Sequence, residues 1–205
     1  MSKSLSLYFK MDDKKTALID LIKQTTHLDT KSATEISNSF SIKRLCKGEF
    51  LVKTNQISDD YLFLADGFLR TFLHDTGGNE ITTNFYSKNS IVFEVTSFFQ
   101  RVPSELNIQA ITDCFCFRLS YEQSNELFHR KPGFRDFGRA ILVKEFISSN
   151  QRTISMINQS AEQRYISFLK SNPEVFIHSP LKYIASYLGI TDTSLSRIRR
   201  DFSKK

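Results

Sequence analysis

The apolar positions near the end of the chain have helical spacing and predict two short helices. The first has an apolar face at i, i+3, i+4 and i+7: Leu181, Ile184, Ala185 and Leu188. Gly189 follows where this helix must end, because glycine adopts positive φ without strain. Thr191 offers a side-chain oxygen to the free N–H groups of the second helix, whose apolar positions are Leu195 and Ile198. Two helices joined by so short a turn predict a helix-turn-helix motif.

The outward face of the second helix is polar and basic. It is formed by Thr193, Ser194, Ser196, Arg197, Arg199 and Arg200. In a helix-turn-helix motif this helix enters a DNA major groove. Any small helical hairpin with a solvated basic face would show the same apolar spacing. The small Ala185 at the helix crossing, the glycine turn, the N-cap and the three arginines together favour DNA binding.

Between Phe40 and Leu119 the apolar residues come in short runs separated by turn residues. Seven runs have the length of strands: Phe50–Lys53, Tyr61–Leu64, Phe68–Leu73, Ile81–Tyr86, Ile91–Val95, Leu106–Ala110 and Cys114–Leu119. Many short strands at regular spacing predict an antiparallel sandwich or barrel. Gly77-Gly78 between two alternating runs predicts a hairpin. We therefore expect a jelly-roll domain of about 80 residues.

Helical spacing returns after Ser120. A short helix is predicted from Tyr121 to about His129, and it must stop before Pro132 because the residue ahead of a proline resists helical geometry. A long helix then runs from Gly133 to about Asn158, and a further one from Glu162 to Lys170.

The long helix carries two apolar stripes. One has the spacing of a coiled-coil seam: Val143, Ile147, Asn150, Ile154, Ile157 and Ala161. The other is expected to pack on the β domain: Phe134, Phe137, Ile141, Leu142 and Phe146. Two stripes mean two covered surfaces, so we expect the first to pair two subunits, with Asn150 fixing the register. The alternative is that both stripes pack within one chain.

The remaining segments complete an α+β fold. Amphipathic helices are predicted from Lys14 to about His27 and from Asp29 to about Asn38, whereas Val175–His178 is expected to be extended. Three parts follow: residues 1–132 as an N-terminal helix and antiparallel β-roll, residues 133–159 as a dimerisation helix, and residues 160–205 as a helix-turn-helix domain.

Composition and charge agree with a folded nucleic-acid-binding protein. The chain has 205 residues, 40% of them hydrophobic and including 19 Phe, which is ample for a buried core. From Ser160 to Lys205 there are eight Lys or Arg against four Asp or Glu, so +4 of the formal charge of +6 lies there. No secretory signal and no run of 18 apolar residues is present, so we expect a cytoplasmic protein with no membrane partner.

The cysteines and histidines give no sign of a metal site or an enzyme. Cys46, Cys114 and Cys116 form no CxxC pair, and we expect the last two to lie on one face of a strand as small core residues. The four histidines are scattered with no HxH, and GxSxG, P-loop and GxGxxG motifs are absent. We therefore expect no catalysis, no metal and no cofactor.

The order of β-roll, long helix and C-terminal helix-turn-helix resembles the cyclic-AMP receptor protein/FNR (Crp/Fnr) family of bacterial transcription regulators. The resemblance covers nearly the whole chain. It is carried by the segments Lys47–Leu51, Asp60–Arg70, Pro103–Ser120 and Leu181–Arg200, and the last two look like the branch common in Bacteroidetes-type bacteria. It implies a homodimer that binds a palindromic DNA site, a roll that senses a signal, and RNA polymerase as a further partner.

The resemblance implies which residues contact DNA, when the helix-turn-helix of this chain is matched to that of the family. Asp192, Thr193, Ser196 and Arg197 fall near the start of the recognition helix, where family members touch base edges. Arg197 is the foremost candidate, because a guanidinium can donate two hydrogen bonds to guanine O6 and N7. The residues suited to phosphates are Thr191, Ser194, Arg199, Arg200 and Lys182.

The sensor segment, Val92–Asn107, departs from the family pattern. Cyclic-nucleotide binders have a Gly-Glu pair that holds the ribose and a later Arg-Ser or Arg-Thr whose arginine neutralises the phosphate. Here Glu94 matches the glutamate, but Phe93 replaces the glycine and Pro103-Ser104 stands where the arginine should lead. Arg101 is two or three residues out of register.

A buried phosphate without a paired cation is costly, so we expect that the roll does not bind cyclic AMP in the usual way. Glu94, Arg101 and Ser104 remain the candidate effector residues. The roll either binds another small molecule in an apolar, Phe-rich pocket or is purely structural. A scaffold that senses a small molecule without a specific DNA role is the alternative function.

Overall fold

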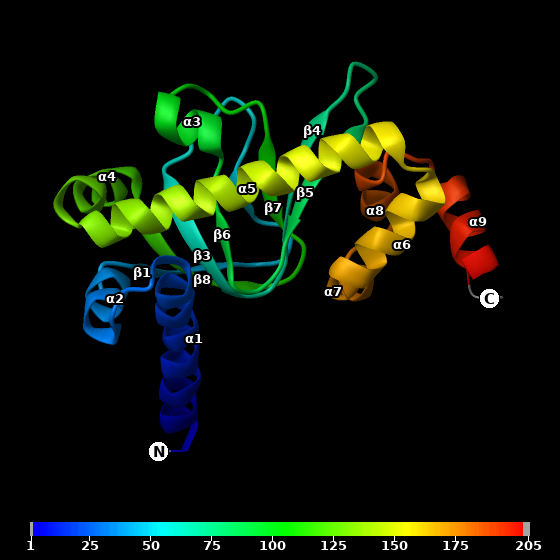
Figure 1. The fold of residues 1–205 in the computed structure, drawn as a ribbon. Helices are drawn as coiled ribbons and strands as arrows, with labels where there is room; N and C mark the ends of the chain where they lie inside the picture. Colours follow the sequence, from blue (N-terminus) through cyan, green and yellow to red (C-terminus); the bar gives the residue numbers. More distant parts are fainter. Residues whose placement is uncertain (1, 203–205) are drawn as a thin grey trace.

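The computed structural model of the chain describes residues 2–202, with side chains from Asp13 to Phe202. Helices α1 (Ser2–Thr26) and α2 (Thr30–Ser37) come first, and α1 begins earlier than the predicted Lys14. The strands that follow are β1 (Ser41–Leu45), β2 (Phe50–Val52), β3 (Asp60–Asp66), β4 (Leu69–His74), β5 (Glu80–Tyr86), β6 (Ser90–Val92), β7 (Asn107–Ala110) and β8 (Cys114–Ser120). Figure 1 shows the long helix α5 (Pro132–Asn158) crossing in front of these strands, with the C-terminal helices at one end.

The strands form the antiparallel roll that the sequence predicts. One sheet has the order β1-β8-β3-β6 and the other the order β2-β7-β4-β5, with every neighbouring pair antiparallel. The Gly77-Gly78 hairpin is confirmed as the turn between β4 and β5. There Asp75 Oδ1 accepts hydrogen bonds from the N–H groups of Gly77 and Asn79, at 2.8 and 2.9 Å.

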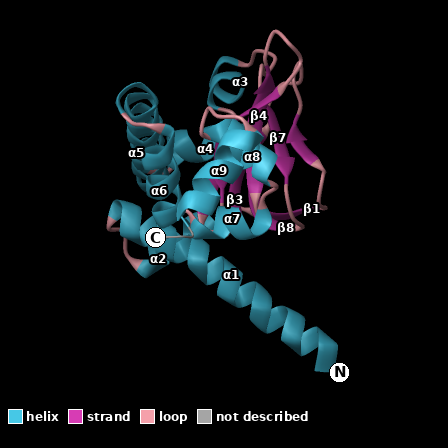
Figure 2. Cartoon of the chain, turned by 90° about the vertical axis from the view of Figure 1, so that its right-hand side faces the viewer, coloured by secondary structure: helices cyan, strands magenta, loops and turns pink. Residues whose placement is uncertain are grey.

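Strand β3 is buried on both faces. Leu62 and Leu64 belong to the core inside the roll, whereas Tyr61 and Phe63 belong to a second core that includes Leu18 of α1 and the helix α5. Because both faces are covered, β3 is a continuous apolar run without polar alternation. Helices α1 and α5 therefore cover one face of the sheet that contains β3. Figure 2 shows the helices and strands from a second direction.

The buried cysteines have the structural role expected from the sequence. Cys114 and Cys116 both lie in the core inside the roll. Burial raises the pKa of the Cys116 thiol to about 12, so its reactive thiolate is not populated at neutral pH.

Two helices connect the roll to the C-terminal part. Helix α4 (Tyr121–Arg130) begins with a capping box between Ser120 and Gln123, and α5 (Pro132–Asn158) follows after Lys131. The buried residues of α5 are Phe134, Phe137 and Ile141, as the second apolar stripe predicts.

The prediction that Phe146 packs on the roll is wrong. Its side chain is 71% exposed. Five residues separate it from Ile141, which is about 140° around a helix of 3.6 residues per turn. Phe146 therefore points away from the roll while Ile141 points into it.

The C-terminal part consists of α6 (Ala161–Ser171), α7 (Pro173–His178), α8 (Leu181–Tyr187) and α9 (Asp192–Phe202). Val175–His178, expected to be extended, is helical. Pro173 occupies the first helical position, where its missing N–H costs nothing, and Val175 is buried. Ala161 starts α6 behind the N-cap Ser160, so the coiled-coil stripe of α5 ends at Ile157.

Two short elements differ from the sequence prediction. Strand β1, which no predicted run covers, pairs with β8 from Ser41↔Arg118 to Leu45↔Cys114. The predicted strand Ile91–Val95 ends at Val92, and helix α3 (Val95–Gln100) follows it. The Glu94 carboxylate caps this helix and so ends the strand.

Two glycines with positive φ provide a test of the roll's packing. Gly67 has φ +102°, and a Cβ there would lie 2.5 Å from the Asp113 carbonyl oxygen. Gly48 has φ +86° with nothing within 4 Å of a Cβ. Gly67→Ala should lower the free energy of unfolding by about 3 kcal/mol, through backbone strain and overlap. Gly48→Ala should lower it by about 1 kcal/mol, through strain alone. Urea unfolding measures both, and equal losses would contradict the tight contact at Gly67.

Candidate nucleic-acid interface

The turn between α8 and α9 is built as the sequence predicts. Gly189 has φ +66°, and its N–H donates to the Ser186 carbonyl at 3.1 Å. The Ile190 N–H donates to the Ala185 carbonyl at 3.0 Å, which completes a Schellman motif at the end of α8. A Cβ on Gly189 would lie 2.4 Å from Met156 Cε of α5, but that atom is the end of a flexible, exposed side chain that can move, so it is the positive φ that favours glycine here.

Helix α9 starts at a side-chain cap. The Ser194 N–H donates to Thr191 Oγ1 at 3.2 Å, and the Thr191 and Ser194 hydroxyls are 3.0 Å apart. This cap satisfies one of the free N–H groups of the first turn. Asp192 lies in that turn, where a negative charge is favourable.

The predicted DNA-contacting residues lie on α8, on α9 and in the turn between them, and Thr193, Ser194, Ser196, Arg197 and Arg200 line one shallow hollow. The exposed ones are Lys182, Thr191, Asp192, Thr193, Ser196, Arg197, Arg199 and Arg200, and Ser194 is half-buried. Leu195 is fully buried and Ile198 packs against the same core. Among the described residues Arg197 has no ion-pair partner, so its guanidinium projects freely from the second turn of α9.

Two arginines that the sequence did not single out hold the end of α8. Arg164 of α6 donates from Nε and Nη2 to the Leu188 carbonyl, at 3.1 and 3.0 Å. Arg152 of α5 donates to the Tyr187 carbonyl at 2.9 Å, and its guanidinium carbon lies 4.6 Å from the centre of the Tyr187 ring. Cations at carbonyls that lack helical partners complement the helix dipole. The turn before α9 is thus fixed to α5 and α6.

The opposite side of α8 is docked on the roll. Ser186 Oγ accepts from the Thr82 N–H at 2.7 Å and donates to the Glu80 carbonyl at 3.1 Å. The guanidinium carbon of Arg70, from β4, lies 3.4 Å from the centre of the Tyr183 ring. Nothing local in the sequence connects β4 and β5 with a helix about a hundred residues later, so these contacts could not be predicted.

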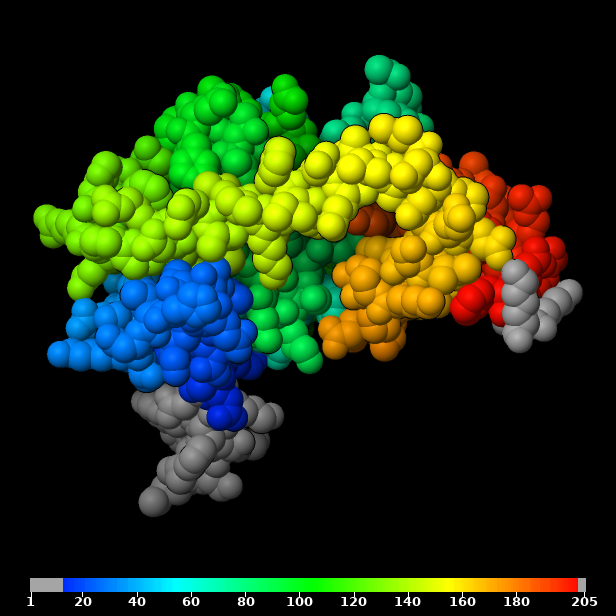
Figure 3. Space-filling model, viewed as in Figure 1, coloured from blue at the N-terminus to red at the C-terminus, as the bar shows by residue number. Residues whose placement is uncertain are grey.

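The apolar stripe of α5 is uncovered in the single chain. Its members are Val143, Ile147, Asn150, Ile154 and Ile157, which we call the dimer seam. Their side chains are all exposed, and Ile157 reaches 81%. Figure 3 shows α5 as an open ridge across this face of the molecule.

The three candidate effector residues make contacts within the chain. Glu94 is 6% exposed, and its carboxylate accepts from the N–H groups of Thr96 and Ser97 as the cap of α3. Ser104 Oγ donates to the Leu106 carbonyl at 2.8 Å. These positions lie on the roll as expected, but their polar atoms are already paired.

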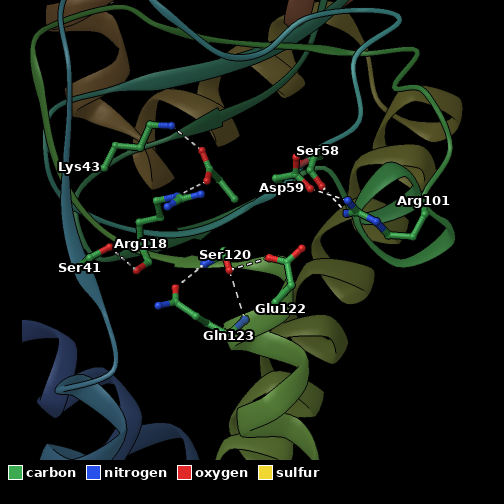
Figure 4. A network of polar contacts seen from close by, with 10 residues as sticks. Ser41, Lys43, Ser58, Asp59, Arg101, Arg118, Ser120, Glu122 and Gln123 are labelled. Carbon is green, nitrogen blue, oxygen red and sulfur yellow. Dashed lines mark hydrogen bonds and ion pairs between the residues drawn. The ribbon is translucent and has the colours of Figure 1, made fainter.

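Arg101 is paired as well. It has φ 58° at the end of α3, and its guanidinium forms an ion pair with Asp59 and donates to the Ser58 carbonyl at 2.9 Å. Figure 4 shows this arginine directed to Ser58 and Asp59. The guanidinium carbon also lies 4.0 Å from the centre of the Tyr121 ring. Its charge is therefore neutralised by a carboxylate and an aromatic face.

The described part of the chain contains neither a candidate metal cluster nor a candidate membrane-spanning helix. No group of three or more His, Cys, Asp or Glu residues there could hold a metal ion. None of its helices is both long enough and apolar enough to cross a membrane.

Comparison with known proteins identifies the roll. Residues 42–131 match the family model described as the cyclic nucleotide-binding domain. No curated protein sequence gave a significant match.

Solved structures with the same fold come from bacterial regulators. FixK2 from Bradyrhizobium japonicum has a TM-score of 0.72 at 13% identity, over 80% of this chain and 85% of that one. The c-di-GMP-responsive global regulator CLP of Xanthomonas campestris has a TM-score of 0.68 at 15% identity, over 86% and 92%. A transcriptional regulator of the Crp/Fnr family from Eubacterium rectale has a TM-score of 0.67 at 20% identity, over 86% and 84%.

The family model covers the strands of the roll and α4, and the structural similarities extend over the helices that follow. Residues 42–131 therefore match the cyclic nucleotide-binding domain model, and the chain has the fold of the Crp/Fnr regulators that its sequence resembles.

Proposed function

We propose that this protein is a transcriptional regulator that binds a palindromic DNA site as a homodimer. The observation that carries the proposal is the placement of Arg197. It is exposed on a capped helix whose preceding turn is fixed by Arg152 and Arg164. An arginine held at this position can donate two hydrogen bonds to guanine, while Arg199, Arg200 and Lys182 face phosphates.

Dimerisation through α5 supports the same function. The dimer seam exposes four large apolar side chains at coiled-coil spacing, and a second copy of α5 would cover them. A twofold dimer presents two α9 helices to successive major grooves when they stand about 34 Å apart. In this proposal Asn150 sets the register of the pair.

The proposal places the protein in the cytoplasm, where bacterial DNA is, with RNA polymerase as the partner through which transcription is regulated. The roll is proposed to be a degenerate sensor that does not take cyclic AMP in the usual way. Arg101 is already paired with Asp59, and Glu94 already caps α3. A phosphate placed there would lack a free cation.

Two arginine variants separate base recognition from phosphate contact. Arg197→Ala should weaken binding to a selected palindrome by about 1–3 kcal/mol, because a pair of hydrogen bonds to one base is lost. It should also relax the preference at that base pair. Arg200→Ala should instead weaken selected and random duplexes alike, and should reduce the slope of log affinity against log salt by about one. Fluorescence anisotropy at two salt concentrations measures both. Equal effects of the two changes on both duplexes would refute the assignment.

Neighbouring substitutions on α5 test the dimer. Ile147→Asp places a charge within the dimer seam, so light scattering should give the mass of a single chain. Ser148→Asp makes a similar change on an adjacent exposed position outside the seam and should leave the mass of a dimer. A wild-type protein with the mass of one chain, or two variants that both stay dimeric, would argue against this interface.

Calorimetry tests the sensor. Titration with cyclic AMP should give no binding in the micromolar range, because Arg101, the cation of the sensor segment, is held by Asp59. Micromolar binding that Glu94→Ala abolishes would show that the usual site is functional after all.

A further inference from the structure

A cavity of about 270 Å³ lies outside the roll, between β3 and the helices α3, α4 and α5. Figure 1 shows α3 and α4 beside the N-terminal half of α5. The lining includes Tyr61 of β3, Phe98 of α3, Phe128 of α4, and Phe134 and Gly138 of α5. The lining also includes Phe93 and Phe99 of the sensor segment, but none of the candidate effector residues Glu94, Arg101 and Ser104.

The walls of the cavity are mainly aromatic. The ring of Phe98 meets those of Phe93 and Phe99 edge to face, with centroids 5.4 and 5.5 Å apart. Tyr61 and Phe93 are 4.9 Å apart. Aromatic walls favour an aromatic ligand, because rings pack against one another in offset or edge-to-face arrangements.

One polar group in the wall lacks a partner. Tyr61 is 4% exposed, and its hydroxyl makes no hydrogen bond among the described residues. The hydroxyl oxygen itself has almost no accessible surface, so a ligand in the cavity meets the Tyr61 ring and not its hydroxyl. Ser124 is a second buried polar residue in the lining, while Asn125 and His129 are exposed.

The lining contains no carboxylate, lysine or arginine. The guanidinium of Arg101 lies over Tyr121 but is held by Asp59. A charged ligand would lose its hydration without gaining an opposite charge. The ligand should therefore be uncharged, which excludes nucleotides.

The volume limits the size of the ligand. An apolar protein cavity of about 150 Å³ accepts benzene, so about 270 Å³ corresponds to two fused rings. We propose that this cavity binds a small, uncharged, bicyclic aromatic molecule that packs on the aromatic side chains of its wall. This site deepens the proposed regulator by giving it a class of ligand. The ligand would touch Phe134, Gly138 and Leu142, on the same helix as the dimer seam.

Binding to the purified full chain without DNA tests the site independently of the proposed function. The probes are 2-naphthol and naphthalene, which differ by one hydroxyl, measured by fluorescence titration. Wild-type protein should bind both saturably. Tyr61→Phe keeps the ring and removes a hydroxyl that the ligand does not reach, so it should bind both probes as wild type does.

Gly138 provides the blocking variant. Its Cβ would be 3.7 Å from Phe128 Cε2, an ordinary contact, so Gly138→Ala should retain binding. Gly138→Leu fills the cavity from a helical position where leucine is favoured over glycine, so it should fold and bind neither probe. A thermal melt confirms folding of each variant. No binding by wild type, or binding that survives Gly138→Leu, would overturn the proposal.

Discussion

The position of α8 depends on a buried arginine in the roll. Arg70 is 1% exposed, and its guanidinium lies between the rings of Phe72 and Tyr183, with its carbon 4.0 and 3.4 Å from their centres. Its Nη2 donates to Glu80 at 2.6 Å and to Gln109 at 3.0 Å. A buried cation needs these partners, because removing one leaves a charge without compensation. Its Nε and Nη1 have no hydrogen-bond partner among the described residues, and the Tyr183 ring stacked on the guanidinium ties α8 to this arginine.

Helix α8 is therefore held from two sides. Arg70 and the Ser186 hydrogen bonds tie it to β4 and β5, and Arg152 and Arg164 tie its end to α5 and α6. Helix α9 has no comparable set of contacts to the roll; its buried Leu195 packs within the C-terminal core. Helix α8 thus fixes the orientation of the helix-turn-helix motif, and α9 keeps its polar face exposed.

The sequence could predict the features that arise from neighbours in the chain. Gly189, the Thr191 cap and the apolar spacing of α8 and α9 are local signals, and the structure has them in the predicted places. The prediction that Val175–His178 is extended was wrong. Its residues favour a strand, but the proline before them and their tertiary burial favour a helix. The prediction that Phe146 packs on the roll was wrong, because the spacing of apolar residues does not indicate which surface each side of a helix contacts. The contacts of Arg70 and Arg164 join residues that are distant in sequence. Such contacts produce no periodic pattern of apolar residues, so the sequence does not predict them.

The junction between α5 and α6 is short. Only Gln159 separates Asn158, the last residue of α5, from the N-cap Ser160, and Arg164 donates to the Gln159 carbonyl at 2.7 Å. With 27 residues, α5 is about 40 Å long, so it acts as a lever arm. Pivoting at its roll end by one degree would displace its far tip by roughly 0.7 Å, given that length. In a dimer, a small change in the crossing angle of the two α5 helices would therefore cause a larger displacement of the two α9 helices.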